Sequence, residues 1–108
     1  MNPTHWVPAA TVGEFGENRK LARVIEGHEV LLIRLGQAFV AVSNRCTHLG
    51  RPLLQGRLME GTLTCPYHGA CFDLRNGAAL SGPAVARLRC YKVLLEGDTL
   101  LIDAGLPY

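Results

Sequence analysis

The sequence predicts an all-β protein, in which a small antiparallel sandwich or barrel base contains a loop-rich insert. Three observations support this class. The apolar segments are short and rich in Val, Ile, Leu and Thr, as antiparallel strands are. Turns of hairpin length that contain glycine separate several of these segments. Finally, no window of about 12 residues or more keeps a capped helical period of apolar residues, so long helices are not expected.

The expected strands follow one another along most of the chain. They are Trp6–Val7, Leu21–Ile25, Glu29–Arg34, Gln37–Ser43, Leu58–Thr64, Arg89–Leu95 and Thr99–Ile102. Hairpin turns are expected at Gly27, Gly36 and Gly97, where glycine allows a positive φ. The segment from Glu29 to Ile33 has apolar residues on both strand faces, which predicts a central strand covered on both sides. A short turn is expected between Pro8 and Glu17, and Trp6 is expected in the core.

The chain of 108 residues is long enough for one compact core, so we predict a single domain, residues 1–108. Between about residues 44 and 83 the amino-acid composition changes: glycine and proline become frequent and β-branched residues become rare. This stretch is predicted to be the insert, placed between strands that belong to the base.

Composition excludes several function classes. The net charge is only +2 and the basic residues are scattered along the sequence, so binding to nucleic acid is not expected. No apolar run approaches the roughly 20 residues that span a bilayer, and no membrane segment is predicted. The N-terminal residues lack the basic and apolar stretches of an export signal, so the cytoplasm is the expected location.

Two Cys/His pairs stand out inside the insert. Cys46-Thr47-His48 and Cys65-Pro66-Tyr67-His68 are separated by the sixteen residues from Leu49 to Thr64. Two cysteines and two histidines suit either a tetrahedral metal ion or a two-iron cluster. Zinc sites of this composition usually pair cysteine with cysteine and histidine with histidine. Here each loop supplies one of each, which favours a cluster whose two ends differ chemically.

This pattern resembles the signature of Rieske-type [2Fe–2S] proteins. The residues that flank the ligands match the family as well: Thr47, Leu49, Gly50, Pro66, Gly69, Phe72, Asp73 and Gly77. The resemblance implies that Cys46 and Cys65 hold one iron while His48 and His68 hold the other. It also implies that the two imidazoles lie at the surface and form the port for electrons.

The resemblance further implies a low reduction potential. High-potential relatives have an extra cysteine in each loop, joined as a disulfide, where this chain has Arg51 and Tyr67. They also place serine and tyrosine hydroxyls near the cluster sulfurs, at positions that are Ala70 and Phe72 here. Because hydrogen bonds to sulfur stabilise the reduced state, we expect a potential at the low end of the Rieske range, on the order of −150 mV.

These features predict an electron carrier that is not itself an enzyme, because a cluster with all protein ligands committed has no open site for substrate. A mononuclear iron centre would need two further histidines and a carboxylate, and His5 and His28 are the only candidates. The resemblance is closest to ferredoxins of aromatic-ring dioxygenase systems, which implies a flavin-dependent reductase and a terminal oxygenase as partners. The alternatives are the small Rieske subunit of an NAD(P)H-dependent nitrite reductase and a zinc-stabilised interaction module.

The remaining candidate residues allow plainer interpretations. Cys71 and Cys90 are expected to be buried thiols, although a disulfide or a further ligand is the functional alternative. Asp73 is expected to fix the second loop. Arg51 and Arg57 either steer the protein toward an acidic partner or are simply solvated. A last group of apolar residues in or beside the loops forms either a shield for the cluster or a patch for partners: Leu49, Pro52, Leu53, Leu54 and Tyr67.

Overall fold

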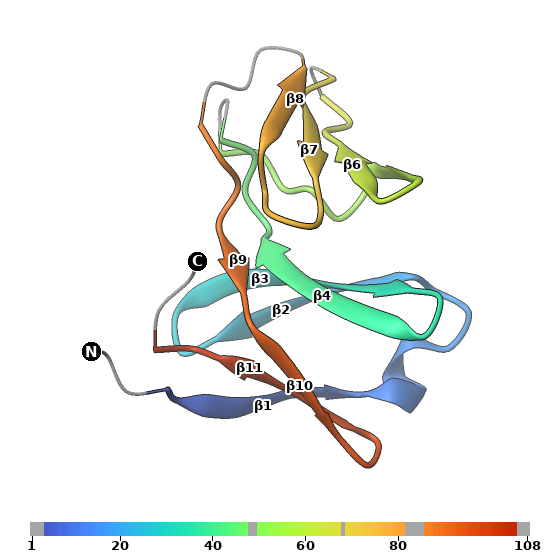
Figure 1. The fold of residues 1–108 in the computed structure, drawn as a ribbon, viewed down its shortest axis with the longest axis vertical. Coiled ribbons are helices and arrows are strands. Elements are labelled where there is room, and N and C mark those ends of the chain that lie inside the picture. Colours follow the sequence, from blue (N-terminus) through green and yellow to red (C-terminus); the bar gives the residue numbers. More distant parts are fainter. Residues whose placement is uncertain (1–3, 48–49, 68, 82–85, 106–108) are drawn as a thin grey trace.

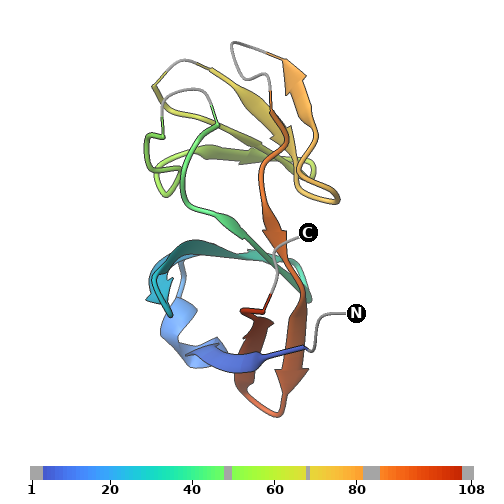
Figure 2. The same cartoon turned by 90° about the vertical axis from the view of Figure 1, so that its left-hand side faces the viewer.

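The protein has two lobes, which Figures 1 and 2 show one above the other. The computed structural model describes residues 4–47, 50–67, 69–81 and 86–105. We call residues 44–89 the insert lobe, and the described residues before and after it the base. The chain enters the insert lobe after β4 and returns through β9, two strands that pair with each other at the junction.

The base contains two antiparallel sheets. The first has the order β1-β11-β10 and the second the order β2-β3-β4-β9. Their strands are β1 (Trp6–Thr11), β2 (Lys20–Ile25), β3 (His28–Leu35), β4 (Ala38–Ser43), β9 (Cys90–Tyr91), β10 (Val93–Glu96) and β11 (Thr99–Asp103). One short 3-10 helix, η1 (Val12–Phe15), lies within the turn that the sequence predicts between Pro8 and Glu17.

The insert lobe contains a third antiparallel sheet, of order β5-β6-β7-β8. Its strands are β5 (Arg57–Met59), β6 (Thr62–Thr64), β7 (Cys71–Asp73) and β8 (Ala79–Ser81). The all-β class is therefore confirmed, and the insert has more regular structure than a loop-rich stretch suggests. Among the described residues, the structure contains no helix with the length and apolarity needed to cross a membrane.

Three expected strands are wrong in their extent. The first, Trp6–Val7, continues to Thr11 as β1, so the turn expected from Pro8 onward begins only at Val12. The segment Leu58–Thr64 is a tight hairpin rather than one strand, because Glu60 and Gly61 both take a positive φ and reverse the chain. The segment Arg89–Leu95 is broken at Lys92. Before that residue β9 pairs with β4 in the second sheet, and after it β10 pairs with β11 in the first.

Strand β3 separates two apolar cores, as its two apolar faces predict. Val30 and Leu32 pack into the core of the base, together with Phe15 and Ile102. Leu31 and Ile33 point the other way and pack into a second core. All four residues of β3 from Val30 to Ile33 are buried. The second core continues into the insert lobe, so the base supports that lobe directly.

Trp6 does not lie in the core. It opens β1, which is an edge strand of the first sheet, and 38% of its surface remains exposed. The expectation from its size is therefore wrong, because an edge strand at the start of the chain is covered on one side only.

Candidate metal centre

The first Cys/His loop begins just after β4 and is closed by two backbone hydrogen bonds. The N–H of Cys46 donates to the carbonyl of Arg51 (2.8 Å), and the N–H of Gly50 donates back to the carbonyl of Cys46 (2.7 Å). Gly50 takes a φ of 70°, which L-residues with a Cβ rarely adopt. The loop is therefore a defined turn around Cys46.

The second loop begins just after β6 and repeats this pattern. The N–H of Cys65 donates to the carbonyl of Ala70 (2.7 Å), and the N–H of Gly69 donates to the carbonyl of Cys65 (3.1 Å). Gly69 has a φ of 77° and stands four residues after its cysteine, as Gly50 does. The two loops therefore match in their backbone hydrogen bonds.

Both cysteines lie at the end of one apolar core. Cys46 and Cys65 are each 2% exposed, and both pack in the cluster of buried residues that contains Leu31 and Ile33 of β3. Buried apolar surroundings exclude water and lower the local dielectric. The two sulfur positions are thus held on a packed support by two equivalent turns.

A contact between Arg51 and Tyr67 joins the two loops. The guanidinium carbon of Arg51 lies 5.1 Å from the centroid of the Tyr67 ring, a cation–π distance. The resemblance assigns these two positions to the disulfide of high-potential relatives. In this structure a non-covalent contact between the two side chains links the loops. Tyr67 remains 50% exposed, so the contact is at the surface.

A third segment supports the first loop. The hydroxyl of Thr47 donates to the carbonyl of Ala86 (2.8 Å), and the N–H of Leu88 donates to the carbonyl of Gly77 (2.7 Å). Residues 86–89 therefore connect the first loop to the turn that follows β7. No local pattern predicts this arrangement, because the contact joins residues 39 positions apart.

The surroundings of the second loop are apolar, as expected for a low potential. Ala70 and Phe72 are both fully buried and lie in the same core as the two cysteines. Neither side chain has a hydroxyl that could donate a hydrogen bond to sulfur. The potential itself remains a prediction.

Asp73 fixes the turn that follows β7. The sequence predicts that it fixes the second Cys/His loop, but the hydrogen bonds of its carboxylate lie in this turn instead. Its carboxylate accepts hydrogen bonds from the backbone N–H of Arg75 (2.8 Å) and from the Arg75 guanidinium (2.8 Å to the closer oxygen). The hydrogen bonds from the Arg75 side chain are the largest cause that lowers the pKa of Asp73 below its usual range. The ion pair also satisfies a carboxylate that is 7% exposed.

The expectation that both remaining thiols are buried is right for Cys90 and wrong for Cys71. Cys90 is 3% exposed, and burial raises the pKa of its thiol. Cys71 is only partly buried and lines a surface groove beside Cys65. The two residues do not form a disulfide.

The apolar residues near the loops do not act as one group. Leu53 is fully buried in the core, whereas Pro52 and Tyr67 are exposed and Leu54 is intermediate. Leu49 lies outside the described residues. Leu53 is therefore placed as a shield would be and Tyr67 as part of a partner surface would be, and both roles stay predictions.

The two predicted histidine ligands, His48 and His68, also lie outside the described residues. Within the part of the chain that the structure describes, no three His, Cys, Asp or Glu side chains form a group able to hold a metal ion. The two cysteines are the predicted ligands that the structure describes. Two buried thiols in equivalent turns, each followed by a histidine, suit a cluster that two loops hold from opposite sides.

Comparisons with curated proteins identify dioxygenase ferredoxins as relatives. The chain is 32% identical over 98 residues to the ferredoxin component of the naphthalene 1,2-dioxygenase system of Pseudomonas aeruginosa, covering 91% of this chain and 94% of that protein. It is 36% identical over 104 residues to the 3-phenylpropionate/cinnamic acid dioxygenase ferredoxin subunit of Escherichia coli (strain K12), covering 95% and 94%.

Solved structures agree with this result. The ferredoxin of carbazole 1,9a-dioxygenase from Nocardioides aromaticivorans IC177 superposes with a TM-score of 0.85 at 31% identity, covering 93% of this chain and 98% of that one. A complex of reduced oxygenase and oxidized ferredoxin in carbazole 1,9a-dioxygenase contains a chain of the same fold, with a TM-score of 0.85 at 20% identity and coverage of 98% of both chains. Residues 5–92 match the Rieske [2Fe-2S] domain, so this chain belongs to the Rieske family and its cofactor is a [2Fe–2S] cluster.

Proposed function

We propose that this protein is the ferredoxin component of a Rieske dioxygenase system, which accepts one electron from a flavin-dependent reductase and passes it to a terminal oxygenase. The observation that supports this most directly is the pair of equivalent turns around Cys46 and Cys65 at the end of a packed core. The ferredoxin relatives align over nearly all of this chain and over nearly all of their own length.

We assign four ligands to the cluster, with Cys46 and Cys65 on one iron and His48 and His68 on the other. When bound, the cluster supplies a site for one electron. The chain's own residues position and shield it. The two turns fix the cysteines, Leu53 and Phe72 exclude water beneath them, and Arg51 and Tyr67 join the loops above.

The two histidines outside the ligand motifs contact other side chains of the protein. His5 contacts Glu26 and His28 contacts Tyr91. Neither belongs to a group of metal-binding side chains within the described residues. The catalytic iron of such a system is thus assigned to the partner oxygenase.

The comparisons favour this function over the small subunit of a nitrite reductase, because the relatives named above are ferredoxins of matching length. Membership of the Rieske family also sets aside the zinc module. We further place the protein in the cytoplasm, where thiols such as those of Cys71 and Cys90 stay reduced.

The ligand assignment is tested with matched variants. Cys65→Ser and His68→Ala are expected to lose iron, sulfide and the red-brown colour. Cys71→Ser and His28→Ala serve as controls, and they are expected to keep about two irons per chain. EPR of the dithionite-reduced protein should show the lower average g value of mixed nitrogen and sulfur ligation. A colourless zinc protein, or iron retained in both ligand variants, would contradict the assignment.

The carrier role is tested with partners. We expect the reductase of the Escherichia coli 3-phenylpropionate dioxygenase system, supplied with NADH, to reduce the protein one electron at a time. Tight association with a nitrite reductase large subunit, without such reduction, would instead support the alternative.

A further inference from the structure

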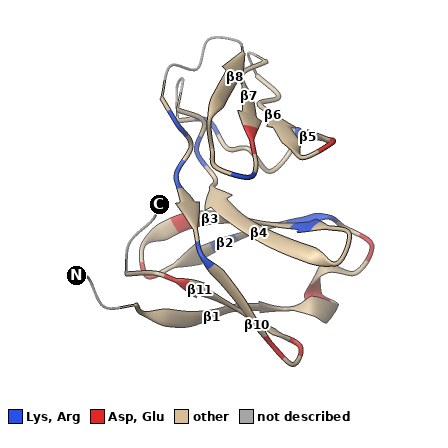
Figure 3. Ribbon diagram, viewed as in Figure 1, with Lys and Arg blue, Asp and Glu red and all other residues tan. Residues whose placement is uncertain are grey.

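Charge is distributed unequally between the two lobes. The insert lobe contains six arginines and only two carboxylates, whereas the rest of the chain contains five basic and seven acidic residues. One of the two carboxylates, Asp73, is already paired with Arg75. Figure 3 shows the basic residues along the segments that connect the lobes and around the insert lobe. The small net charge of the whole chain therefore conceals a positive end, and this is the end that contains the Cys/His loops.

Three of these arginines surround one groove beside the first loop. Arg45, Arg87 and Arg89 line an open groove of about 450 Å³, and Cys46 and Thr47 line it as well. The arginines come from two separate segments, which is why they look scattered in the sequence. The groove is thus a basic surface directly next to a proposed cluster ligand.

The backbone around this groove is well anchored. In the segment 86–90, Leu88 and Cys90 are buried while Arg87 and Arg89 are exposed, as alternation in an extended chain predicts. The carbonyl of Arg89 accepts a hydrogen bond from the N–H of Ser43 (2.8 Å), and Thr47 donates to Ala86 (2.8 Å). The two outward guanidinium groups therefore start from fixed backbone positions, which reduces the entropy lost on binding.

Arg87 and Arg89 have no acidic partner among the described residues. The four ion pairs found there use His5, Arg23, Arg45 and Arg75. Arg45 contacts Glu29, so its charge is partly neutralised. Two exposed and uncompensated guanidinium groups on one groove wall match carboxylates, with which arginine forms bidentate hydrogen bonds.

We infer that this groove docks an acidic face of the protein that exchanges electrons with this chain, with carboxylates of that partner between Arg45, Arg87 and Arg89. The inference rests on the proposed function. Opposite charges at the interface would steer the encounter and orient the partner over the first loop. A free small anion fits less well, because the arginines are exposed and spread along an open groove rather than gathered around one enclosed point.

The test compares two acceptors that differ in charge. Native cytochrome c is basic, and its succinylated form is acidic with the same haem. The dithionite-reduced protein is mixed with each in a stopped-flow instrument at low salt and at about 0.5 M salt, where exposed charges are screened. We expect the acidic form to react faster at low salt and to lose this advantage at high salt.

Two charge-reversal variants locate the effect. Arg87→Glu/Arg89→Glu removes the groove charge, and Arg19→Glu/Lys92→Glu makes the same change of net charge on the base. We expect the groove variant to react about tenfold more slowly with acidic, succinylated cytochrome c at low salt. With basic, native cytochrome c it should react faster than the wild type. The base variant should change either rate by much less. If Arg87→Glu/Arg89→Glu does not fold, Arg87→Gln/Arg89→Gln takes its place. We expect this variant to slow the reaction with the acidic cytochrome by a smaller factor, because it removes the two charges without reversing them.

The possible results distinguish the docking inference from the proposed function as an electron carrier. Equal effects in the groove and base variants would overturn the docking inference and leave the carrier role intact, because only net charge would matter. A wild-type protein that assembles no cluster, or transfers electrons to neither acceptor, would overturn the proposed function. Binding of a short DNA duplex at about 0.15 M salt that depends on Arg87 and Arg89 would assign the groove to nucleic acid instead.

Discussion

At the scale of single residues, the side chains around the second cysteine set the expected electronic properties. Ala70 and Phe72 are fully buried beside Cys65, and neither has a hydroxyl. The identity of these residues is readable from the sequence. Their burial in the same core as Cys46 is a result of the structure, because it depends on how the insert sheet packs on β3.

Installing hydroxyls there is expected to raise the reduction potential. A hydrogen bond to a charged group contributes about 1.5 kcal/mol, which equals roughly 60 mV for one electron, so Ala70→Ser and Phe72→Tyr should each raise the midpoint by about that amount. Protein-film voltammetry measures the shift, with Ala78→Ser as a control outside the core. An unchanged midpoint in both variants would refute the hydrogen-bond explanation.

Gly77 shows a different constraint at the same scale. It has a φ of 80°, and a Cβ built there would lie 2.0 Å from the carbonyl oxygen of Leu88. We expect Gly77→Ala to destabilise the protein by more than about 3 kcal/mol, since it combines backbone strain with a steric clash. Gly97→Ala is the matched control, because Gly97 also has a positive φ but no atom within 4 Å of the added Cβ. Urea unfolding that gives equal losses for both would show that φ alone matters.

At the scale of elements, local turn chemistry made the base predictable. The turns at Gly27, Gly36 and Gly97 lie where the sequence places them, because each needs only its own residues. Two features were missed. The turn at Glu60 and Gly61 has the same residue types and positive φ values as the turn at Glu26 and Gly27, so its signal was present but lay inside a segment interpreted as one strand. The change of sheet at Lys92 could not be predicted, because it depends on distant partners.

The surroundings of the two Cys/His loops were also predictable only in part. Their residue pattern predicted a matching pair, and the repeated hydrogen bonds agree with it. The groove of Arg45, Arg87 and Arg89 was not predictable, since its members come together only when the chain returns from the insert lobe to the base.

The contact between the loops should affect how long the cluster stays bound. Arg51→Ala and Tyr67→Leu each remove the cation–π contact, which at an exposed site contributes about 0.5–1 kcal/mol. We expect each to speed the loss of absorbance in the presence of an iron chelator by roughly two- to fivefold, as that energy implies. Arg57→Ala, an exposed arginine of β5, is the control. Loss rates equal to that of the control would mean that the loops are held without this contact.

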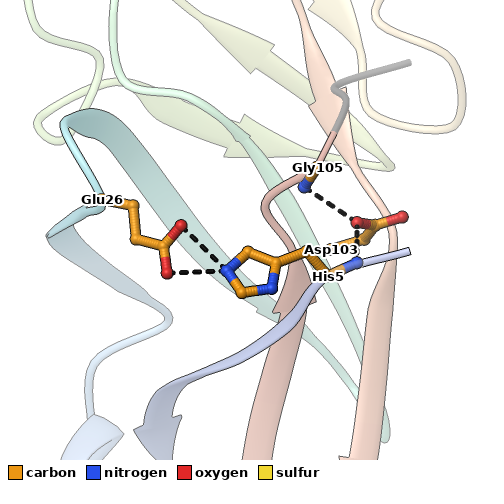
Figure 4. Close-up of polar contacts among 4 residues, drawn as sticks. All are labelled: His5, Glu26, Asp103 and Gly105. Carbon is orange, nitrogen blue, oxygen red and sulfur yellow. Dashed lines mark hydrogen bonds and ion pairs between the residues drawn. The ribbon is translucent and has the colours of Figure 1, made fainter. Parts of the chain in front are cut away.

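At the scale of the whole molecule, the buried carboxylate of Asp103 joins distant parts of the chain. Asp103 at the end of β11 accepts hydrogen bonds from the N–H groups of His5 and Gly105, both at 2.9 Å (Figure 4). The same figure shows His5 in contact with Glu26 from the turn between β2 and β3. Asp103 thus connects the first strand of the base to the last.

This arrangement predicts a stability that falls in acid. The hydrogen bond from His5 is the largest cause that lowers the pKa of Asp103, and hydrogen bonds from Arg75 lower that of Asp73. A folded-state pKa below the unfolded one means that the unfolded chain binds protons first. The stabilisation is therefore complete above the usual carboxyl pKa of about 3.9, and it is lost as pH falls through the lowered value.

Thermal unfolding followed from about pH 6 down to about pH 2 measures this effect. We expect Asp103→Asn to show a lower melting temperature near neutral pH and a flatter dependence on pH than the wild type. Asp98→Asn, in the exposed turn before β11, should keep the wild-type slope. Parallel curves for wild type and Asp103→Asn would contradict the role given to this carboxylate.

Strand β3 contributes side chains to two interiors at once, with Val30 and Leu32 on one side and Leu31 and Ile33 on the other. The two lobes consequently share β3, and unfolding of one lobe would remove packing from a strand that supports the other. We therefore expect a mutation in the core of the base that disturbs the packing of β3 to shorten the lifetime of the bound cluster, although it changes no residue of the Cys/His loops. The time for which this protein can transfer electrons is thus expected to depend on the packing of the base as much as on the Cys/His loops.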